Sequence, residues 1–257
     1  MGKRKDSERE EKFEEDIVDV DFDFFDLKED DFLSIKSLLR QMIGADSNLF
    51  NLSSLAQLTI DAPVGTAIKT NDEEFDDVLA ILAITEVDFT ESTETGKLVQ
   101  YWIKRTEQNP DLNRALRKIA HNKNSTGLII SERFINMPFD VVVPLYTLMI
   151  QECKARNINF EYILIPSRVY TEIASELNAN PSQPKRGTSQ EYHLFHHEDE
   201  CIDQVAVAAG NFKYETPVDE TDSRRAFQEN GILPHGHLAI IKASQLETLL
   251  AKLSALS

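Results

Sequence analysis

The chain has 257 residues, 41% of them hydrophobic, so it is long enough to bury one large core or two small ones. Lys and Arg total 27 against 44 Asp and Glu, a formal net charge of −17. So acidic a surface repels nucleic-acid phosphates and anionic membranes and attracts basic proteins, although many soluble proteins are acidic without such a role. With two cysteines, no bilayer-long apolar segment and no signal-peptide core, the chain is expected to be intracellular.

The N-terminus differs in composition from the rest of the chain. Residues 1–16 are charged and carry almost nothing to bury, which predicts a disordered tail ahead of a single domain over residues 17–257. In the tail, Lys3, Arg4 and Lys5 form a short basic cluster that is either a nuclear import signal or simply solvated.

Two acidic runs are the candidate partner-binding residues. In IVDVDFDFFDL the apolar residues alternate with aspartates, which predicts a strand with one apolar and one acidic face. The second run, NDEEFDD, predicts an acidic loop. Clustered carboxylates repel each other, and either a cationic partner or water relieves that repulsion. The candidates are Asp19, Asp21 and Asp23 on the strand and Asp72, Glu73, Glu74, Asp76 and Asp77 in the loop.

The remaining pattern alternates helices and strands. Apolar spacing predicts a helix that Asp30 or Asp31 caps and Gly44 ends. Asn109-Pro110 separates two further helices, and Pro144 kinks or delays the start of a helix that follows Pro138. The other predicted elements are a short helix at 51–58, strands at 64–70, within 78–89, at 127–130 and 160–165, a flexible connection at 178–190, a helix at 197–209, strands at 211–215 and 236–242, and a helix at 243–256. This interleaving predicts an α/β sheet protein.

Residues 131–146, SERFINMPFDVVVPLY, hold no catalytic set. Ser131 has no histidine in local reach and lies outside a G-x-S-x-G elbow, while Arg133 and Asn136 are of types that are usually structural at a strand–helix joint. The segment is therefore expected to be the end of a strand, a turn and the start of a helix.

Two histidine groups invite a metal or catalytic interpretation. His193, His196, His197, Glu198 and Asp199 offer ligand types, but the H-E-x-x-H order is absent, and a strand-to-helix junction with two acids at the helix N-terminus explains them better. His235 and His237 flank a glycine and are expected in a solvent-exposed turn. No metal is expected at these histidines. None of the nine glycines forms a G-x-G that could hold the pyrophosphate of acetyl-CoA, so no cofactor is expected either.

Several segments together resemble the BCCIP family: IVDVDFDFF, DFLSIKSLLRQM, LSSLAQL, AIKT, GLIISERFINMPFDVVVPLY and YHLFHHEDE, in that order. The resemblance implies a GCN5-related acetyltransferase fold, a single domain with a mixed β-sheet flanked by helices, without acetyltransferase activity. It also implies protein partners: a basic large-subunit ribosomal protein of the uL-fourteen family, a lipid-kinase export cargo, a breast-cancer susceptibility protein and a cyclin-dependent kinase inhibitor.

We therefore expect a non-enzymatic binding protein, largely nuclear with shuttling to the cytoplasm, that shields a basic ribosomal protein in ribosome biogenesis. It is expected to bind neither nucleic acid nor membrane directly. One alternative is a regulatory scaffold for cell-cycle or DNA-repair proteins. Another is an acyltransferase that binds its cofactor without the usual glycines.

Overall fold

The computed structural model describes residues 22–70, 77–172, 191–216 and 232–256. The predicted tail, the strand residues before Phe22 and the connection at 178–190 lie outside the described residues. In the part of the chain that is described, no helix is both long enough and apolar enough to cross a bilayer.

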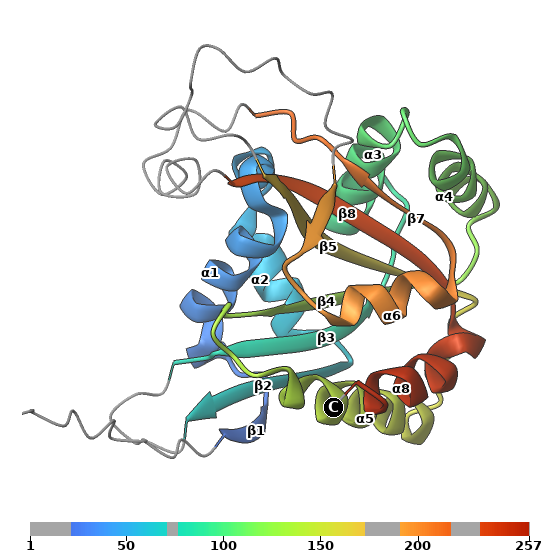
Figure 1. Ribbon diagram of the computed structural model, residues 1–257. Helices are drawn as coiled ribbons and strands as arrows, with labels where there is room; N and C mark the ends of the chain where they lie inside the picture. The colour runs from blue at the N-terminus through green and yellow to red at the C-terminus, as the bar shows by residue number, and fades with distance from the viewer. Residues whose placement is uncertain (1–21, 71–76, 173–190, 217–231, 257) are drawn as a thin grey trace, which may run out of the picture.

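One mixed sheet of eight strands organises the described residues (Figure 1). The order across it is β1-β2-β3-β4-β5-β8-β7, with β6 also paired to β5. Among these strands β4 and β5 are parallel neighbours, and the other pairs are antiparallel. The strands are β1 (Phe22–Asp26), β2 (Val64–Thr70), β3 (Ala80–Glu86), β4 (Thr126–Arg133), β5 (Tyr162–Glu172), β6 (Tyr192–Leu194), β7 (Ala206–Phe212) and β8 (Ile232–Lys242).

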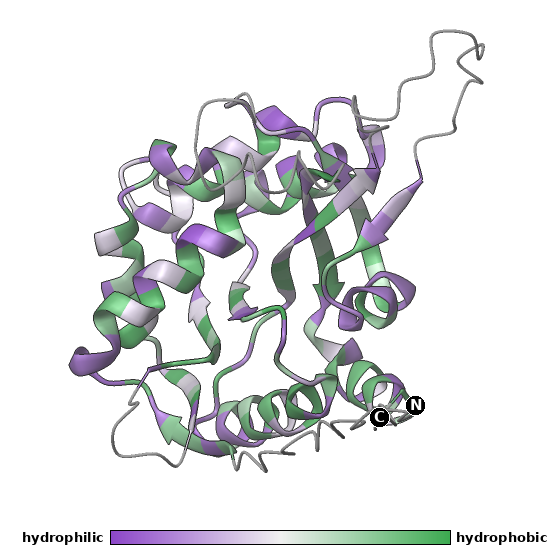
Figure 2. Ribbon diagram, turned by 60° about the vertical axis from the view of Figure 1, so that its left-hand side comes forward, coloured by the Kyte–Doolittle hydropathy of each residue, from purple (hydrophilic) through white to green (hydrophobic). Residues whose placement is uncertain are grey.

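Helices cover both faces of the sheet, and a separate hydrophobic cluster fills each interface. On one face lie α1 (Phe32–Ile43), α2 (Leu52–Ile60), α3 (Glu94–Arg105) and α4 (Pro110–Asn122); on the other lie α5 (Val142–Ala155), α6 (Glu198–Val205) and α8 (Leu246–Ser254). Figure 2 shows hydrophobic residues along the central strands and alternating with hydrophilic ones along the covering helices. The predicted α/β class, with a mixed sheet flanked by helices, is confirmed.

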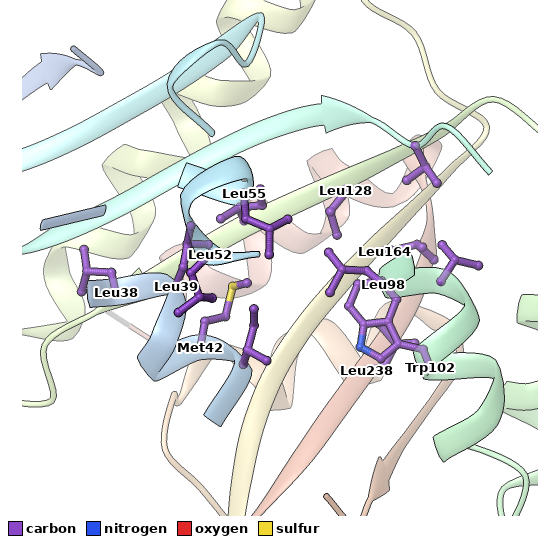
Figure 3. Packing of buried hydrophobic residues seen from close by; sticks show 14 of the residues in the cluster. Leu38, Leu39, Met42, Leu52, Leu55, Leu98, Trp102, Leu128, Leu164 and Leu238 are labelled. Carbon is purple, nitrogen blue, oxygen red and sulfur yellow. The ribbon is translucent and has the colours of Figure 1, made fainter. Parts of the chain in front are cut away.

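The first cluster shows how distant segments meet. Figure 3 shows side chains from α1, α2 and α3 gathered over the strands: Leu38, Leu39, Met42, Leu52, Leu55, Leu98 and Trp102 over Leu128, Leu164 and Leu238. Burying these side chains is the main favourable contribution to the fold, at about 1.5–3 kcal/mol for each large one.

The predicted buried strand within 78–89 is β3, in the interior of the sheet. Its residues alternate between the two clusters, since Ile81 belongs to the first while Leu82 and Ile84 belong to the second. A strand covered on both sides needs apolar residues at every position, which explains its continuous apolar sequence.

Several predicted boundaries are confirmed. Helix α1 ends at Gly44, which adopts a left-handed φ of 70°. Helix α4 begins with Pro110 after Asn109, whose side chain accepts a hydrogen bond from the Leu112 amide. The true start of α5 is delayed to Val142 by a short 3-10 turn, which leaves Pro144 in the first helical turn.

Three predictions were wrong. Asp31 occupies the predicted N-cap position of α1, but its side chain makes no cap, because its carboxylate lies 2.6 Å from the Lys69 ammonium instead. The helix predicted at 197–209 ends at Val205, since residues 206–212 pair with β8 as β7. The strand predicted at 211–215 accordingly ends at Phe212.

Candidate functional site

The candidate functional site is the crevice where β4 and β5 separate. The two parallel strands pair through residues 126–128 of β4 and 162–164 of β5, and β6 then takes the same edge of β5 at residues 169–171. Figure 1 shows β4 and β5 diverging. Crevices beyond the carboxyl ends of neighbouring strands are where open α/β sheets commonly bind ligands.

Glu132, near the end of β4, occupies this crevice with its side chain 1% exposed. Its Oε2 lies 3.1 Å from Nη2 of Arg168 on β5, and its Oε1 lies 2.9 Å from Nε2 of His196. Gln41 of α1 donates a hydrogen bond of 3.0 Å to the same Oε1. The side chains of four segments therefore fill the space between the strands.

A second buried ion pair lies on the opposite face of β4. The Arg133 guanidinium donates to both carboxylate oxygens of Glu198 in the first turn of α6, with 2.9 Å between Nη2 and Oε2. The next residue, Asp199, accepts a hydrogen bond of 2.5 Å from the Ser167 hydroxyl on β5. These contacts fix the start of α6 against the diverging strands, so the predicted strand-to-helix junction is confirmed.

The network sets the charges of its members. Burial opposes ionisation of Glu132, but the Arg168 and His196 charges outweigh it and lower the pKa of this carboxyl. Burial also opposes a charge on His196, yet the Glu132 carboxylate raises the pKa of the imidazole. Burial and the nearby Glu198 charge raise the pKa of Asp199 to about 6.

The histidines have structural contacts. His193 lies against the ring of Tyr170 with 5.2 Å between centroids, and His197 is exposed at the start of α6. His235 and His237 are buried within β8, so the predicted exposed turn was wrong. His237 Nε2 lies 3.0 Å from Asp203 Oδ1. Throughout the described ranges, no three His, Cys, Asp or Glu side chains are placed to hold a metal ion.

The two cysteines, Cys153 and Cys201, are free and buried. Burial raises the pKa of both thiols, which disfavours the thiolate that a nucleophilic cysteine needs. Their positions in the second hydrophobic cluster account for them as core residues.

Two of the acidic candidates can be placed. Asp23 is half-buried on β1 and pairs in register with Lys69 of β2, and Asp77 is exposed and accepts a hydrogen bond of 3.3 Å from the Ser34 hydroxyl. The other six lie outside the described residues: Asp19, Asp21, Asp72, Glu73, Glu74 and Asp76. Their role in partner binding stays a prediction.

The sequence interpretation missed Glu132 and Arg168 as a pair. Each directly follows a serine at the end of an apolar run, LIISE in one strand and ILIPSR in the other. An ionisable residue continuing a buried strand is costly unless it is paired, so this position was the signal that could have found them.

The fold and this crevice together define a class: a mixed-sheet α/β protein whose diverging parallel strands are joined by a buried ion pair. The chain belongs to the BCCIP family, whose model matches residues 17–202. The resemblance inferred from the sequence is therefore confirmed, and membership of this family supports a non-enzymatic binding protein.

The relatives match most of the chain. Protein BCP1 of Yarrowia lipolytica is 37% identical over 251 residues, which is 93% of this chain and 82% of that protein. Protein bcp1 of Schizosaccharomyces pombe is 34% identical over 254 residues, covering 93% of this chain and 90% of that one. The crystal structure of BCP1 from Saccharomyces cerevisiae is similar with a TM-score of 0.64 and 26% identity, covering 96% of this chain and 93% of that chain.

Proposed function

We propose that this protein is a non-enzymatic nuclear escort for a basic large-subunit ribosomal protein of the uL-fourteen family, acting in ribosome biogenesis and nuclear export. The observation that carries the proposal is the formal net charge of −17. A client that binds ribosomal RNA has a strongly cationic surface, which needs shielding until assembly. An acidic escort supplies that shielding and speeds the encounter.

The distribution of charge supports this client. The buried cations are neutralised within the fold, since Lys69 pairs with Asp31, Arg133 with Glu198 and Arg168 with Glu132. These pairs cancel and add nothing to the net charge. The excess of acid is therefore carried by the rest of the chain, where a basic partner can reach exposed groups such as Asp26 and Asp77.

The filled crevice supports binding rather than catalysis. Arg168 and His196 each pair with Glu132 across the diverging strands, so the charged groups at this point are engaged with one another's common partner and not with a ligand. Residues 131–146, which run from the crevice into α5, also contain no glycine. A pyrophosphate group needs bared backbone N–H groups, which glycines allow it to approach.

A binding assay tests the proposal. The full chain is titrated with the purified uL-fourteen ribosomal protein and, as a control, with an unrelated ribosomal protein of matched net charge. We expect the first to bind at least about tenfold more tightly, because shape complementarity adds to the shared electrostatic attraction. Equal affinity for both proteins would contradict a dedicated escort.

Two cellular measurements test the remaining parts. A crosslinked pull-down from nuclear extract should recover the ribosomal protein, whereas recovery of cell-cycle or DNA-repair proteins without it would favour the regulatory scaffold. A fluorescent fusion should accumulate in the nucleus and leave it when export is active. A fusion that stays outside the nucleus would exclude the nuclear role.

A further inference from the structure

The two edges of the sheet are protected to different degrees. On β7, the register shifts between Ala206 and Ala208, which marks a bulge or irregularity, and Asn109 of α4 donates a hydrogen bond of 3.3 Å to the Ala209 carbonyl. Irregular pairing and side-chain contacts of this kind prevent a further strand from joining a sheet. The β7 edge is therefore closed to strand addition.

Among the described residues, the β1 edge shows neither an irregular register nor a side-chain hydrogen bond to its outer backbone groups. It pairs with β2 without a register shift, and no described strand lies on its other side. Its sequence, FDFFD, contains no proline, glycine or lysine, and Phe24 and Phe25 are each 37% exposed. An edge strand with large exposed aromatic side chains and unpaired backbone groups is a template for another strand.

A hollow of about 400 Å³ runs beside this edge between β1 and α5, which lie next to each other in Figure 1. Phe24, Phe25 and Leu148 form its apolar lining, and Asp26, Glu152 and Lys28 supply its charged groups. Of the two acids in this lining, Glu152 pairs with Arg156 at 3.2 Å, and the exposed Asp26 lies on β1 itself. The hollow therefore suits an apolar side chain flanked by a cation.

The acids on β1 also decide which strand is admitted. Charged side chains are a usual guard of sheet edges because they repel an identical edge. Asp23 and Asp26 repel a second copy of this chain, whose net charge is also −17. The same carboxylates attract a basic strand, so the edge favours a basic partner over an identical edge.

We propose that β1 is a docking edge, to which a basic partner adds an extended segment as a further strand of the sheet. Main-chain hydrogen bonds hold the added strand, one of its apolar side chains enters the hollow against Phe24, and a cation two residues further along, on the same face of the added strand, lies near Asp26. The identity of the natural partner rests on the proposed function, whereas the site itself does not.

Hydrogen exchange with a defined probe tests the site directly. The probe is a short peptide that repeats valine–valine–lysine–lysine, so that valine and lysine alternate along each face of the extended strand. Its control has the same charge but two valines replaced by proline, which cannot donate to a ladder. We expect the probe to slow exchange of the amides at residues 22–26 and leave those of β7 unchanged. The proline peptide should leave exchange unchanged both at residues 22–26 and in β7. Equal effects of the two peptides, or no slowing at residues 22–26, would overturn the proposal.

A matched pair of variants tests the same edge with the ribosomal protein as partner. Phe24→Lys removes the exposed ring and adds a positive charge, and Val207→Lys makes the same change at a side chain 53% exposed on β7. We expect Phe24→Lys to weaken binding about tenfold, because an apolar contact is lost and a cation is repelled, and Val207→Lys to change it less than about twofold. The thermal transition of each variant shows whether the fold is intact.

The outcomes separate this inference from the proposed function. If the ribosomal protein binds while residues 22–26 exchange as in the free protein, the docking edge is excluded and the escort function stands. If the ribosomal protein does not bind but the lysine–valine peptide protects residues 22–26, the edge stands and the proposed client is wrong.

Discussion

Glu132 on β4 and Arg168 on β5 form an ion pair of 3.1 Å across the point where the two parallel strands separate. The pair replaces main-chain hydrogen bonds that the diverging strands no longer make with each other. Because His196 and Gln41 also bind Glu132, this one carboxylate joins both strands to α1 and to the turn before α6.

Removing the charge of Glu132 should destabilise the protein strongly. We expect Glu132→Gln to lower the free energy of unfolding by about 3 kcal/mol, since it leaves Arg168 buried without its anion. Chemical denaturation measures this loss. Glu247→Gln, which removes the partner of Lys154 in an exposed pair, is the control and should change stability by less than about 1 kcal/mol. Equal effects of the two substitutions would show that the crevice pair is not a structural link.

The same variant should alter the pH dependence of stability. The raised pKa of His196 gives stability that is present below its ordinary value of 6.5 and is lost as pH rises through the folded pKa. The lowered pKa of Glu132 gives stability that is present above 4.5 and is lost as pH falls through the folded pKa. The difference in stability between parent and Glu132→Gln should therefore be widest between pH 4.5 and 6.5.

Asp199 should act in the opposite sense. Its pKa is raised from 3.8 to about 6, so the folded state holds the proton more tightly, and this residue lowers stability as pH rises through that interval. We expect Asp199→Asn to stabilise the protein by about 1–3 kcal/mol at pH 7, with no gain below pH 4. The amide oxygen can still accept the Ser167 hydrogen bond. The exposed Asp111→Asn, followed in the same denaturation curves, is the control.

The acidic loop should steer association with the basic client. We predict that replacing Asp72, Glu73, Glu74, Asp76 and Asp77 by the corresponding amides slows association and flattens its salt dependence. Each exposed charge contributes only about 0–1 kcal/mol, so no single replacement should abolish binding. Stopped-flow rates across a salt series measure both quantities. A parent-like rate and slope, with the fold intact, would mean that the client binds elsewhere.

Acetyl-CoA should not bind. A ligand at a hundred times its dissociation constant stabilises a protein by about 2.7 kcal/mol, which thermal denaturation detects readily. We expect no shift for this protein and a clear shift for a genuine acetyltransferase measured alongside. A dose-dependent shift here would restore the acyltransferase alternative.

Limited trypsin digestion should leave one compact unit. We predict early cleavage in residues 1–16 and in the connection at 178–190, and none at Arg133, whose guanidinium is buried against Glu198. Separate stable fragments released by a cut within 131–146 would contradict the single domain over residues 17–257.

The sequence by itself determined the elements whose signals are local. Gly44 ends a helix because its φ is positive. Asn109 caps the start of another helix with its side chain, and Pro110 suits the first position of that helix. The continuous apolar run of β3 predicted a strand buried on both faces. The family segments were also recognisable without coordinates, because each is a contiguous string of residues.

Only the tertiary structure decided the partners of those elements. Residues 206–209 are alanine-rich and suit a helix, yet pairing with β8 makes them a strand. His235 and His237 are polar residues beside a glycine, yet β8 carries them into the interior. Glu132 and Arg168 lie far apart in the chain, and the separation of β4 from β5 brings their charges together. Propensities act over a few residues, whereas burial and ion pairing depend on which distant segments meet, so the sequence pattern predicted the elements and the fold decided the crevice.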